Sequence, residues 1–387
     1  MTGKMSRIVP ALLFGGLLAL TFPAPSFAHG DTAAGGETPA SPETPDPSAG
    51  ERQVEPYHTL AEKKAAGRAR NITDRITISG LIEVEAAAEN VDFADGTADA
   101  ASDLTLATAQ IALGVKLTER VRGNISLLFE EGAFGDEDTD LEVDEAAVDI
   151  YFPSLFGRFG RLYLPFGVYH SHFISDPLTL ALGETRETAL LLGYGHDLFS
   201  LSAFVFNGDA GKIGQEDQID DWGASLVLTP AEGIELGGSY LADLADSDAG
   251  LLAEYRRRVG GWSSFATVEH GPFGASAEIL GGVQSFDAAD LDADGNGKGD
   301  RPLAWNLEVS WAPVEQVEVA ARYEGSDEFA GQPERQYGVA VSWSLWEDAT
   351  LSLEYLRGRF DQDFSADEEG NVPDRRELLG AQLAFEF

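Results

Sequence analysis

The feature that most constrains this chain is an alternation of apolar and polar residues that runs from Arg75 to the last residue, Phe387. In residues 76–86, isoleucine, valine and alanine occupy one parity, and threonine, serine and glutamate occupy much of the other. Successive side chains of a β-strand point to opposite faces, whereas a helix repeats about every 3.6 residues. The pattern therefore predicts strands that each have one apolar face and one polar face.

The alternation is broken by two kinds of segment that follow each other strictly along the chain. Seven breaks are short turns, such as 118–120 and 230–232, and eight are long and mostly acidic. The long breaks are predicted at 89–102, 132–141, 167–185, 208–219, 244–259, 287–302, 326–335 and 359–376. Fifteen connections imply sixteen strands, the first near 75–88 and the last near 377–387.

Short turns at one end and long loops at the other are typical of outer-membrane barrels. Inside a bilayer every backbone polar group must be paired, so a spanning sheet has to close on itself. We therefore expect residues 75–387 to form an all-β transmembrane antiparallel up-and-down β-barrel with short periplasmic turns and long extracellular loops. A soluble β-sandwich is the alternative, but it rarely keeps such loop asymmetry over sixteen strands.

Both chain ends agree with export to the outer membrane of a Gram-negative bacterium. Residues 1–28 have a basic start, an apolar stretch and a small-x-small site, which predicts a signal peptide rather than a membrane anchor. Residues 29–56 are rich in Pro and Glu and predict a disordered linker. Residues 57–74 are expected to form a short periplasmic segment, either helical or further linker. Phe385 and Phe387, in the last strand, are typical of the signal that the barrel assembly machinery reads.

Charge and cysteine content exclude several classes of function. The chain has 26 basic and 66 acidic residues, a formal net charge of −40, and no cysteine. Binding of nucleic-acid phosphates requires clustered Lys and Arg, so a nucleic-acid partner is excluded. Without cysteine there is no disulfide framework, thiolate-bound zinc or cysteine nucleophile. The acids are concentrated in predicted loops: nine carboxylates and no basic residue lie between Glu130 and Glu145.

Sixteen strands are enough to enclose an aqueous channel. The predicted loop 167–185 carries more apolar residues than the other long loops, so we expect it to fold into the lumen and narrow it. A surface loop with its own apolar cluster is the alternative. Strand parity and loop position together indicate the pore-lining candidates, which are Asp176, Glu184, Arg186, Glu187, Arg161, Glu83 and Glu85.

A second candidate site lies in the predicted loop 287–302. Oxygen-bearing residues alternate there with glycines, as in the first nine positions of a calcium-binding loop. The candidate ligands are the side chains of Asp292, Asp294, Asn296 and Asp300 and the carbonyl of Lys298. A calcium ion (Ca2+) would be structural there, and a solvated acidic turn is the alternative.

Several motifs resemble the LbtU family of siderophore porins. The longest is Ile174–Glu187, and shorter ones are Leu81–Glu85, Leu141–Ala146, Tyr163–Gly167 and Phe204–Asp209. The resemblance implies an outer-membrane barrel that takes up iron–siderophore complexes without TonB. An acidic mouth would repel the many ferric siderophores that are anionic, unless salt or calcium screens it.

We therefore expect a passive channel for a small-molecule solute, which the resemblance would make an iron–siderophore complex. A general cation-preferring diffusion porin and a structural barrel that binds calcium and lipopolysaccharide are the alternatives. An enzyme is not expected, because only six histidines are present and no nucleophile–base pair is evident. Outer-membrane lipids are the expected surroundings, and a homotrimer is expected by analogy with other sixteen-strand barrels.

Overall fold

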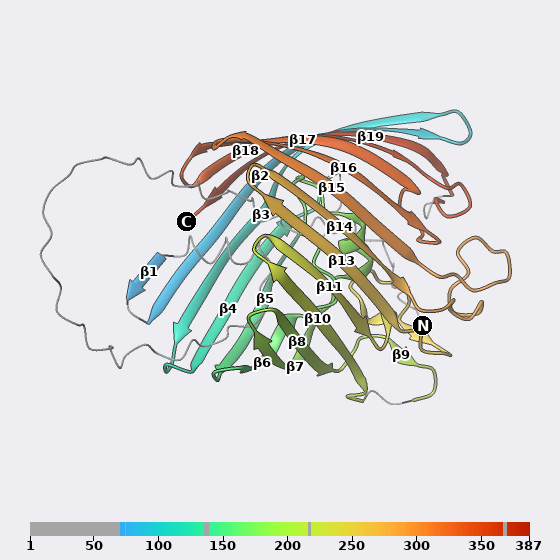
Figure 1. The fold of residues 1–387 in the computed structure, drawn as a ribbon. Helices are drawn as coiled ribbons and strands as arrows, with labels where there is room; N and C mark the ends of the chain where they lie inside the picture. Colours follow the sequence, from blue (N-terminus) through green and yellow to red (C-terminus); the bar gives the residue numbers. More distant parts are fainter. Residues whose placement is uncertain (1–69, 74, 135–138, 216–217, 367–369) are drawn as a thin grey trace, which may run out of the picture.

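A computed structural model describes residues 70–73, 75–134, 139–215, 218–366 and 370–387. Sixteen long strands pair antiparallel, each with the next along the chain, and the last, β19, pairs with the first long strand, β2. The ring is therefore closed, and the predicted sixteen-strand barrel is confirmed (Figure 1). Among the described residues, no helix has the length and apolarity needed to cross a membrane.

The strands of the ring and the smaller elements have the following bounds. The long strands are β2 (Ile76–Phe93), β3 (Ala98–Lys116), β4 (Val121–Glu131), β5 (Thr139–Tyr151), β6 (Leu155–Tyr163), β7 (Arg186–His196), β8 (Phe199–Phe206), β10 (Asp221–Ala231), β11 (Ile234–Leu241), β13 (Gly261–His270), β14 (Phe273–Gly282), β15 (Leu303–Val314), β16 (Val317–Asp327), β17 (Arg335–Trp346), β18 (Ala349–Arg359) and β19 (Pro373–Glu386). The smaller elements are β1 (Arg70–Thr73), α2 (Leu178–Gly183), the 3-10 helix η1 (Leu244–Asp246), and the parallel pair β9 (Gly211–Lys212) and β12 (Glu254–Tyr255).

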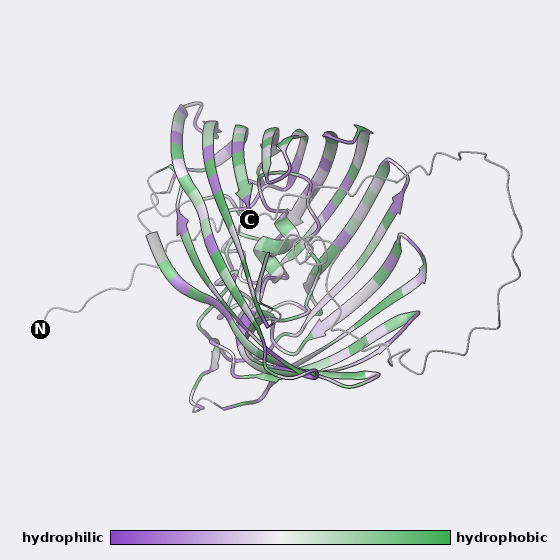
Figure 2. Ribbon diagram, turned by 90° about the vertical axis from the view of Figure 1, so that its left-hand side faces the viewer, coloured by the Kyte–Doolittle hydropathy of each residue, from purple (hydrophilic) through white to green (hydrophobic). Residues whose placement is uncertain are grey.

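The alternation seen in the sequence separates the two faces of the barrel wall. On β2, Ile82 and Val84 are 42% and 38% exposed on the outer face, whereas Glu83 between them is fully buried on the inner face. Figure 2 shows the same alternation of apolar and polar residues along many strands. Outer side chains can then contact lipid while polar side chains line the interior.

The predicted first loop, 89–102, is wrong, because most of it is strand. β2 continues to Phe93 and β3 begins at Ala98, with a tight turn in which Gly96 has a φ of 86°. The register Val91↔Asp99 keeps the hairpin paired beyond the point where the acidic composition suggested a loop. Backbone pairing does not depend on side-chain polarity, so a polar hairpin can extend beyond the membrane.

Closure of the barrel brings the end of the chain against β2. Gly80 and Phe387 exchange two backbone hydrogen bonds of 2.9 and 3.0 Å. Phe385 and Phe387 are 39% and 40% exposed. On the N-terminal side of Gly80, β1 pairs with residues 76–78 of β2. Residues 70–73, near the end of the predicted periplasmic segment, are therefore strand rather than helix. The predicted signal peptide, the linker and residues 57–69 lie outside the described residues.

Much of the barrel interior on one side is filled by its own long loops. An apolar cluster joins inner wall residues to the segments between β6 and β7, between β11 and β13, and between β14 and β15. Its fully buried members include Leu162, Phe166, Leu182, Leu244 and Val259. The apolar loop residues are thereby removed from water inside the lumen.

Candidate functional site: a loop fastened inside the barrel

The segment between β6 and β7, residues 164–185, lies inside the ring of strands. Its short helix α2 contacts β14, β15 and β16 across the interior, where Figures 1 and 2 show it. Phe173, Leu178 and Leu182 are 1%, 5% and 0% exposed. The structure thus places this apolar loop in the lumen, as the sequence predicted.

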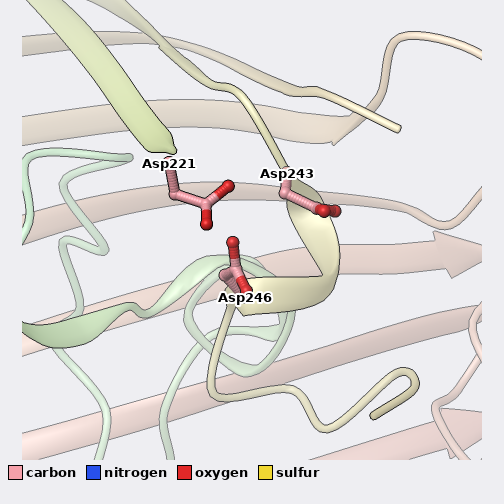
Figure 3. Close-up of side chains that lie close together, drawn as sticks. All are labelled: Asp221, Asp243 and Asp246. Atoms are coloured by element: carbon pink, nitrogen blue, oxygen red, sulfur yellow. The ribbon is translucent and has the colours of Figure 1, made fainter. Parts of the chain in front are cut away.

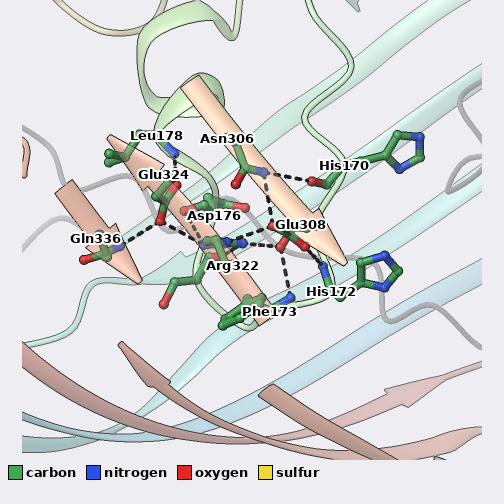
Figure 4. A network of polar contacts seen from close by, with 12 residues as sticks. His170, His172, Phe173, Asp176, Leu178, Asn306, Glu308, Arg322, Glu324 and Gln336 are labelled. Carbon is green, nitrogen blue, oxygen red and sulfur yellow. Dashed lines mark hydrogen bonds and ion pairs between the residues drawn. The ribbon is translucent and has the colours of Figure 1, made fainter. Parts of the chain in front are cut away.

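Four wall carboxylates accept hydrogen bonds from the backbone of this loop. Glu278 of β14 accepts from Val168 (2.8 Å) and Tyr169 (3.0 Å), and its side chain also accepts from the Thr179 hydroxyl (3.1 Å). Figure 4 shows part of the remaining network. The other pairs are Glu308 with His172 (2.8 Å), Glu324 with Leu178 (2.8 Å), and Glu354 with Ile174 (2.9 Å) and Ser175 (3.0 Å). Buried N–H groups outside a sheet need such acceptors.

Arg322 of β16 is the centre of this network. It is 2% exposed, and its guanidinium lies 2.8 Å from Glu308 and 3.4 Å from Glu324. It also donates to the carbonyls of Ser175 (2.9 Å) and Asp176 (3.2 Å) and lies over the Phe173 ring. One cation therefore joins two wall carboxylates to the innermost part of the loop.

Neither Arg322 nor its wall partners were among the candidates predicted from the sequence. The available signal was parity: Glu308, Arg322, Glu324 and Glu354 all lie on the inner face, in strands whose outer residues are largely apolar. Inner-facing acids and an inner-facing Arg on neighbouring strands indicate a paired network rather than a free charged wall.

The candidates from the sequence lie at different places around the loop. Asp176 contributes its carbonyl to Arg322, as described above. Arg186, at the start of β7, lies 2.5 Å from Glu142 and 3.1 Å from Asp144, and Tyr163 donates to Asp144 at 2.6 Å. This second polar group is located where the loop returns to the wall.

The remaining pore candidates lie on the strands. Glu83 and Glu85 project inward from β2, and Glu85 accepts from Gln382 at 2.8 Å. Glu85 also lines a small cavity with Ile174 and Glu354. The loop that joins β6 to β7 therefore reaches the part of the wall formed by β2 and β18. Glu187 pairs in register with Leu162, which is buried on the inner face.

The predicted inward orientation of Arg161 stays a prediction, because its strand position and its ion-pair partner point to different faces of the wall. Arg161 shares its parity with Phe159, which is 43% exposed on the outer face, and its neighbour Leu162 is fully buried inside. Arg161 is itself 40% exposed and lies 3.9 Å from Glu142, near the point where the pairing of β5 with β6 ends. Leu162, which was expected to face lipid, packs instead against the apolar loop cluster.

The candidate calcium loop brings its three Asp side chains together. One carboxylate oxygen from each of Asp292, Asp294 and Asp300 lies within 4.8 Å of the other two. Asp300 accepts from the backbone of Ala293 (2.6 Å), and the Asn296 side chain accepts from the backbone of Lys298 (2.8 Å). Calcium binding by this loop stays a prediction.

Glu184, at the end of α2, is expected to make stability depend on pH. Burial raises its pKa from 4.5 to about 8, and the charge of Asp248 acts in the same direction. A raised folded-state pKa gives a contribution that is complete below the unfolded pKa and is lost as the pH rises through about 8. Glu184→Gln should therefore unfold at a higher temperature than the parent at pH 9 and show less change between pH 5 and 9.

Thermal unfolding in detergent micelles measures this difference. Glu347→Gln is the matched control, because Glu347 lies exposed in the turn between β17 and β18. An equal pH response in the parent and Glu184→Gln would show that Glu184 holds no extra proton.

Comparison with known proteins finds distant relatives whose names state no activity. No known family profile matches the chain. A UPF0422 protein of Coxiella burnetii is 26% identical over 214 residues, which cover 51% of this chain and 46% of that protein. A UPF0422 protein of Legionella pneumophila strain Lens is 26% identical over 346 residues, covering 76% and 61%. The chain thus spans between about half and three fifths of the length of these relatives.

Solved structures share the whole barrel. The outer membrane channel DcaP of Acinetobacter baumannii matches with a TM-score of 0.58 at 16% identity, covering 81% of this chain and 97% of that one. The anion-selective porin from Comamonas acidovorans gives 0.58 at 13%, covering 81% and 99%. A trimer form of OmpT of Vibrio cholerae gives 0.51 at 11%, covering 81% and 100%. This chain therefore has the fold of a sixteen-strand porin.

Proposed function

We propose that this chain is an outer-membrane channel through which small solutes diffuse passively, with the loop 164–185 setting the narrowest part of the path. The observation that carries the proposal is the fastening of this loop across the lumen by Glu278, Glu308, Glu354 and Arg322. A loop built only to cover the mouth would not need buried acceptors from four strands on the opposite wall. Such anchoring supports a fixed constriction.

Conductance in planar bilayers tests the channel. The purified protein should produce stable current steps, and a KCl gradient should give a reversal potential that shows preference for cations. The partly exposed, inner-facing Glu85 and the net charge of −40 favour cations over anions. The absence of current steps from correctly folded protein would contradict the proposal, and preference for anions would contradict its electrostatic part.

The solute class proposed is an iron–siderophore complex that enters without an energised transporter. The motifs around Ile174–Glu187 support it, because this run forms much of the loop that crosses the lumen. Ferric siderophores should cause brief interruptions of the channel current, whereas sugars of similar size should not. Uptake of labelled ferric siderophore should also fall in cells that lack the protein, and unchanged uptake would contradict this solute class.

A general cation-preferring diffusion porin is the second candidate. It is favoured by the inward carboxylates of β2, which would repel an anionic ferric complex. Faster passage of small cationic solutes than of neutral or anionic ones, without interruption by any siderophore, would identify this function instead. Crosslinking in outer membranes tests the proposed homotrimer, for which a ladder ending at three subunits is expected.

A further inference from the structure

Three buried aspartates meet at one end of the barrel, away from the Arg322 network. Asp221 is the first residue of β10, and Asp243 and Asp246 lie at the start and end of η1, between β11 and β13. They are 4%, 0% and 3% exposed. Figure 3 shows their carboxylates in one group, and one oxygen of each lies within 4.8 Å of the other two.

Local structure explains how the three carboxylates come together. Asp243 accepts from the backbone of Ala245 at 3.1 Å and so caps the 3-10 turn that brings Asp246 back toward Asp221. Asp246 accepts from the backbone of Ala210 at 3.0 Å. A Cβ atom on Gly208 would lie 2.1 Å from Oδ1 of Asp246, so a residue without a side chain is needed there.

The hydrogen bonds of this group are incomplete. Oδ2 of Asp246 has no hydrogen-bond partner among the described residues, although the side chain is 97% buried. Buried carboxylate oxygens are nearly always bonded to a donor or a cation. Among the described residues, no cation contacts this oxygen of the three-carboxylate group.

The negative charges of the three aspartates are also not fully balanced by the nearby arginine. Arg258 is the cation that contacts the group, at 3.0 Å from Asp221 and 3.5 Å from Asp243, and it also pairs with the half-exposed Asp220. If all three aspartates are ionised, one arginine leaves two negative charges in a buried position, which is costly unless a further cation or a proton is bound. Burial, reinforced by Asp221 and Asp243, raises the pKa of Asp246 to about 9, so a proton is the competitor.

We propose that Asp221, Asp243 and Asp246 bind one calcium ion. The available ligands are all oxygen atoms, which hard divalent cations prefer, and three carboxylates can supply up to about six of the six to eight oxygens that calcium takes. One divalent charge would balance the two negative charges that Arg258 leaves.

The site would tie together segments that border the pore loop. It joins the start of β10 to η1 and, through Ala210, to the segment that follows β8. Two residues after Asp246, the backbone of Asp248 donates to the carbonyl of Glu184 at 2.8 Å, at the end of α2. Bound calcium would therefore stabilise the loops next to the constriction.

Calcium titration of the full chain in detergent, after treatment with a chelator, tests the proposal. Calcium alone should bind with measurable heat and raise the unfolding temperature, as expected for a ligand that prefers the folded state. Asp246→Asn should weaken binding by at least about tenfold, because one charged ligand is lost. Asp294→Asn, in the other candidate loop, is the matched control and should leave this binding step intact.

Three outcomes would overturn the proposal. They are no calcium binding by the parent, full binding by Asp246→Asn, and loss of all binding in Asp294→Asn. If the parent does not respond while Asp246→Asn is more stable than the parent without calcium, a buried proton occupies the position instead. Heat-dependent mobility on gels confirms folding of each variant, and Asp221→Asn replaces Asp246→Asn if the latter does not fold.

Discussion

Arg322→Met is expected to lower the free energy of unfolding by about 3–5 kcal/mol and to raise the channel conductance. The substitution keeps a long side chain over the Phe173 ring but removes the guanidinium that forms ion pairs with both Glu308 and Glu324. Two buried carboxylates then remain without their cation. The carbonyls of Ser175 and Asp176 also lose their donor, so the innermost part of the loop should leave the wall.

Two controls separate the network from a general loss of charge. Arg357→Met removes an arginine from an ion pair with Glu377 that is about two fifths exposed, and should cost at most about 1 kcal/mol. Arg322→Lys keeps the charge but loses the planar fork that reaches several acceptors, and should fall between the parent and Arg322→Met. Chemical unfolding in lipid vesicles and single-channel recording provide the two measurements.

Unchanged conductance in Arg322→Met, together with the expected loss of stability, would show that the loop does not limit the current. Unchanged stability would show that the two carboxylates are neutralised in another way. The first result would contradict the proposed constriction, and the second would require a different account of how the loop 164–185 is held.

Glu354→Ala should lower the free energy of unfolding by about 2–4 kcal/mol, because it leaves the buried N–H groups of Ile174 and Ser175 without an acceptor. The Ser175 hydroxyl, which also donates to Glu354, loses its partner as well. Since this anchor lies at the far reach of the loop, the channel current should fluctuate more between levels than in the parent.

Glu377→Ala is the matched control for this variant, because it removes a carboxylate from a half-exposed position on the adjacent strand β19. It should change stability by less than about 1 kcal/mol and leave the current steady. Equal effects of the two substitutions would mean that the hydrogen bonds between Glu354 and the loop add no stability beyond that of an ordinary surface carboxylate. Water that enters the space left by Glu354 is expected to recover only part of the loss.

The strands could be predicted because their signal is local. Side chains on a strand alternate between faces, and the two faces of this wall meet lipid and the lumen. Apolar and polar residues therefore alternate with a period of two along the strands. The hairpin at 89–102 was missed because its pairing continues where neither face is apolar. The inner position of Leu162 was missed for a related reason: Leu162 is apolar, yet its apolar surroundings are a folded loop inside the barrel.

The functional residues depend on contacts that the sequence separates widely. Glu354 meets Ser175 across 179 positions, and Arg322 meets Ser175 across 147. No local pattern records such pairs, because only closure of the ring brings the inner faces of β16 and β18 to the loop. The Asp221, Asp243 and Asp246 group is similar, since β11 must return beside β10 before the three carboxylates can meet.

By itself, the sequence determined the all-β class, the strand number, the acidic character and an apolar loop that needed cover, because each follows from composition and short-range periodicity. Only the tertiary structure decided which carboxylates hold that loop, that Arg322 neutralises two of them, and that three aspartates share one buried position. Those outcomes depend on distance through the lumen and on burial, and both arise only when the barrel has closed.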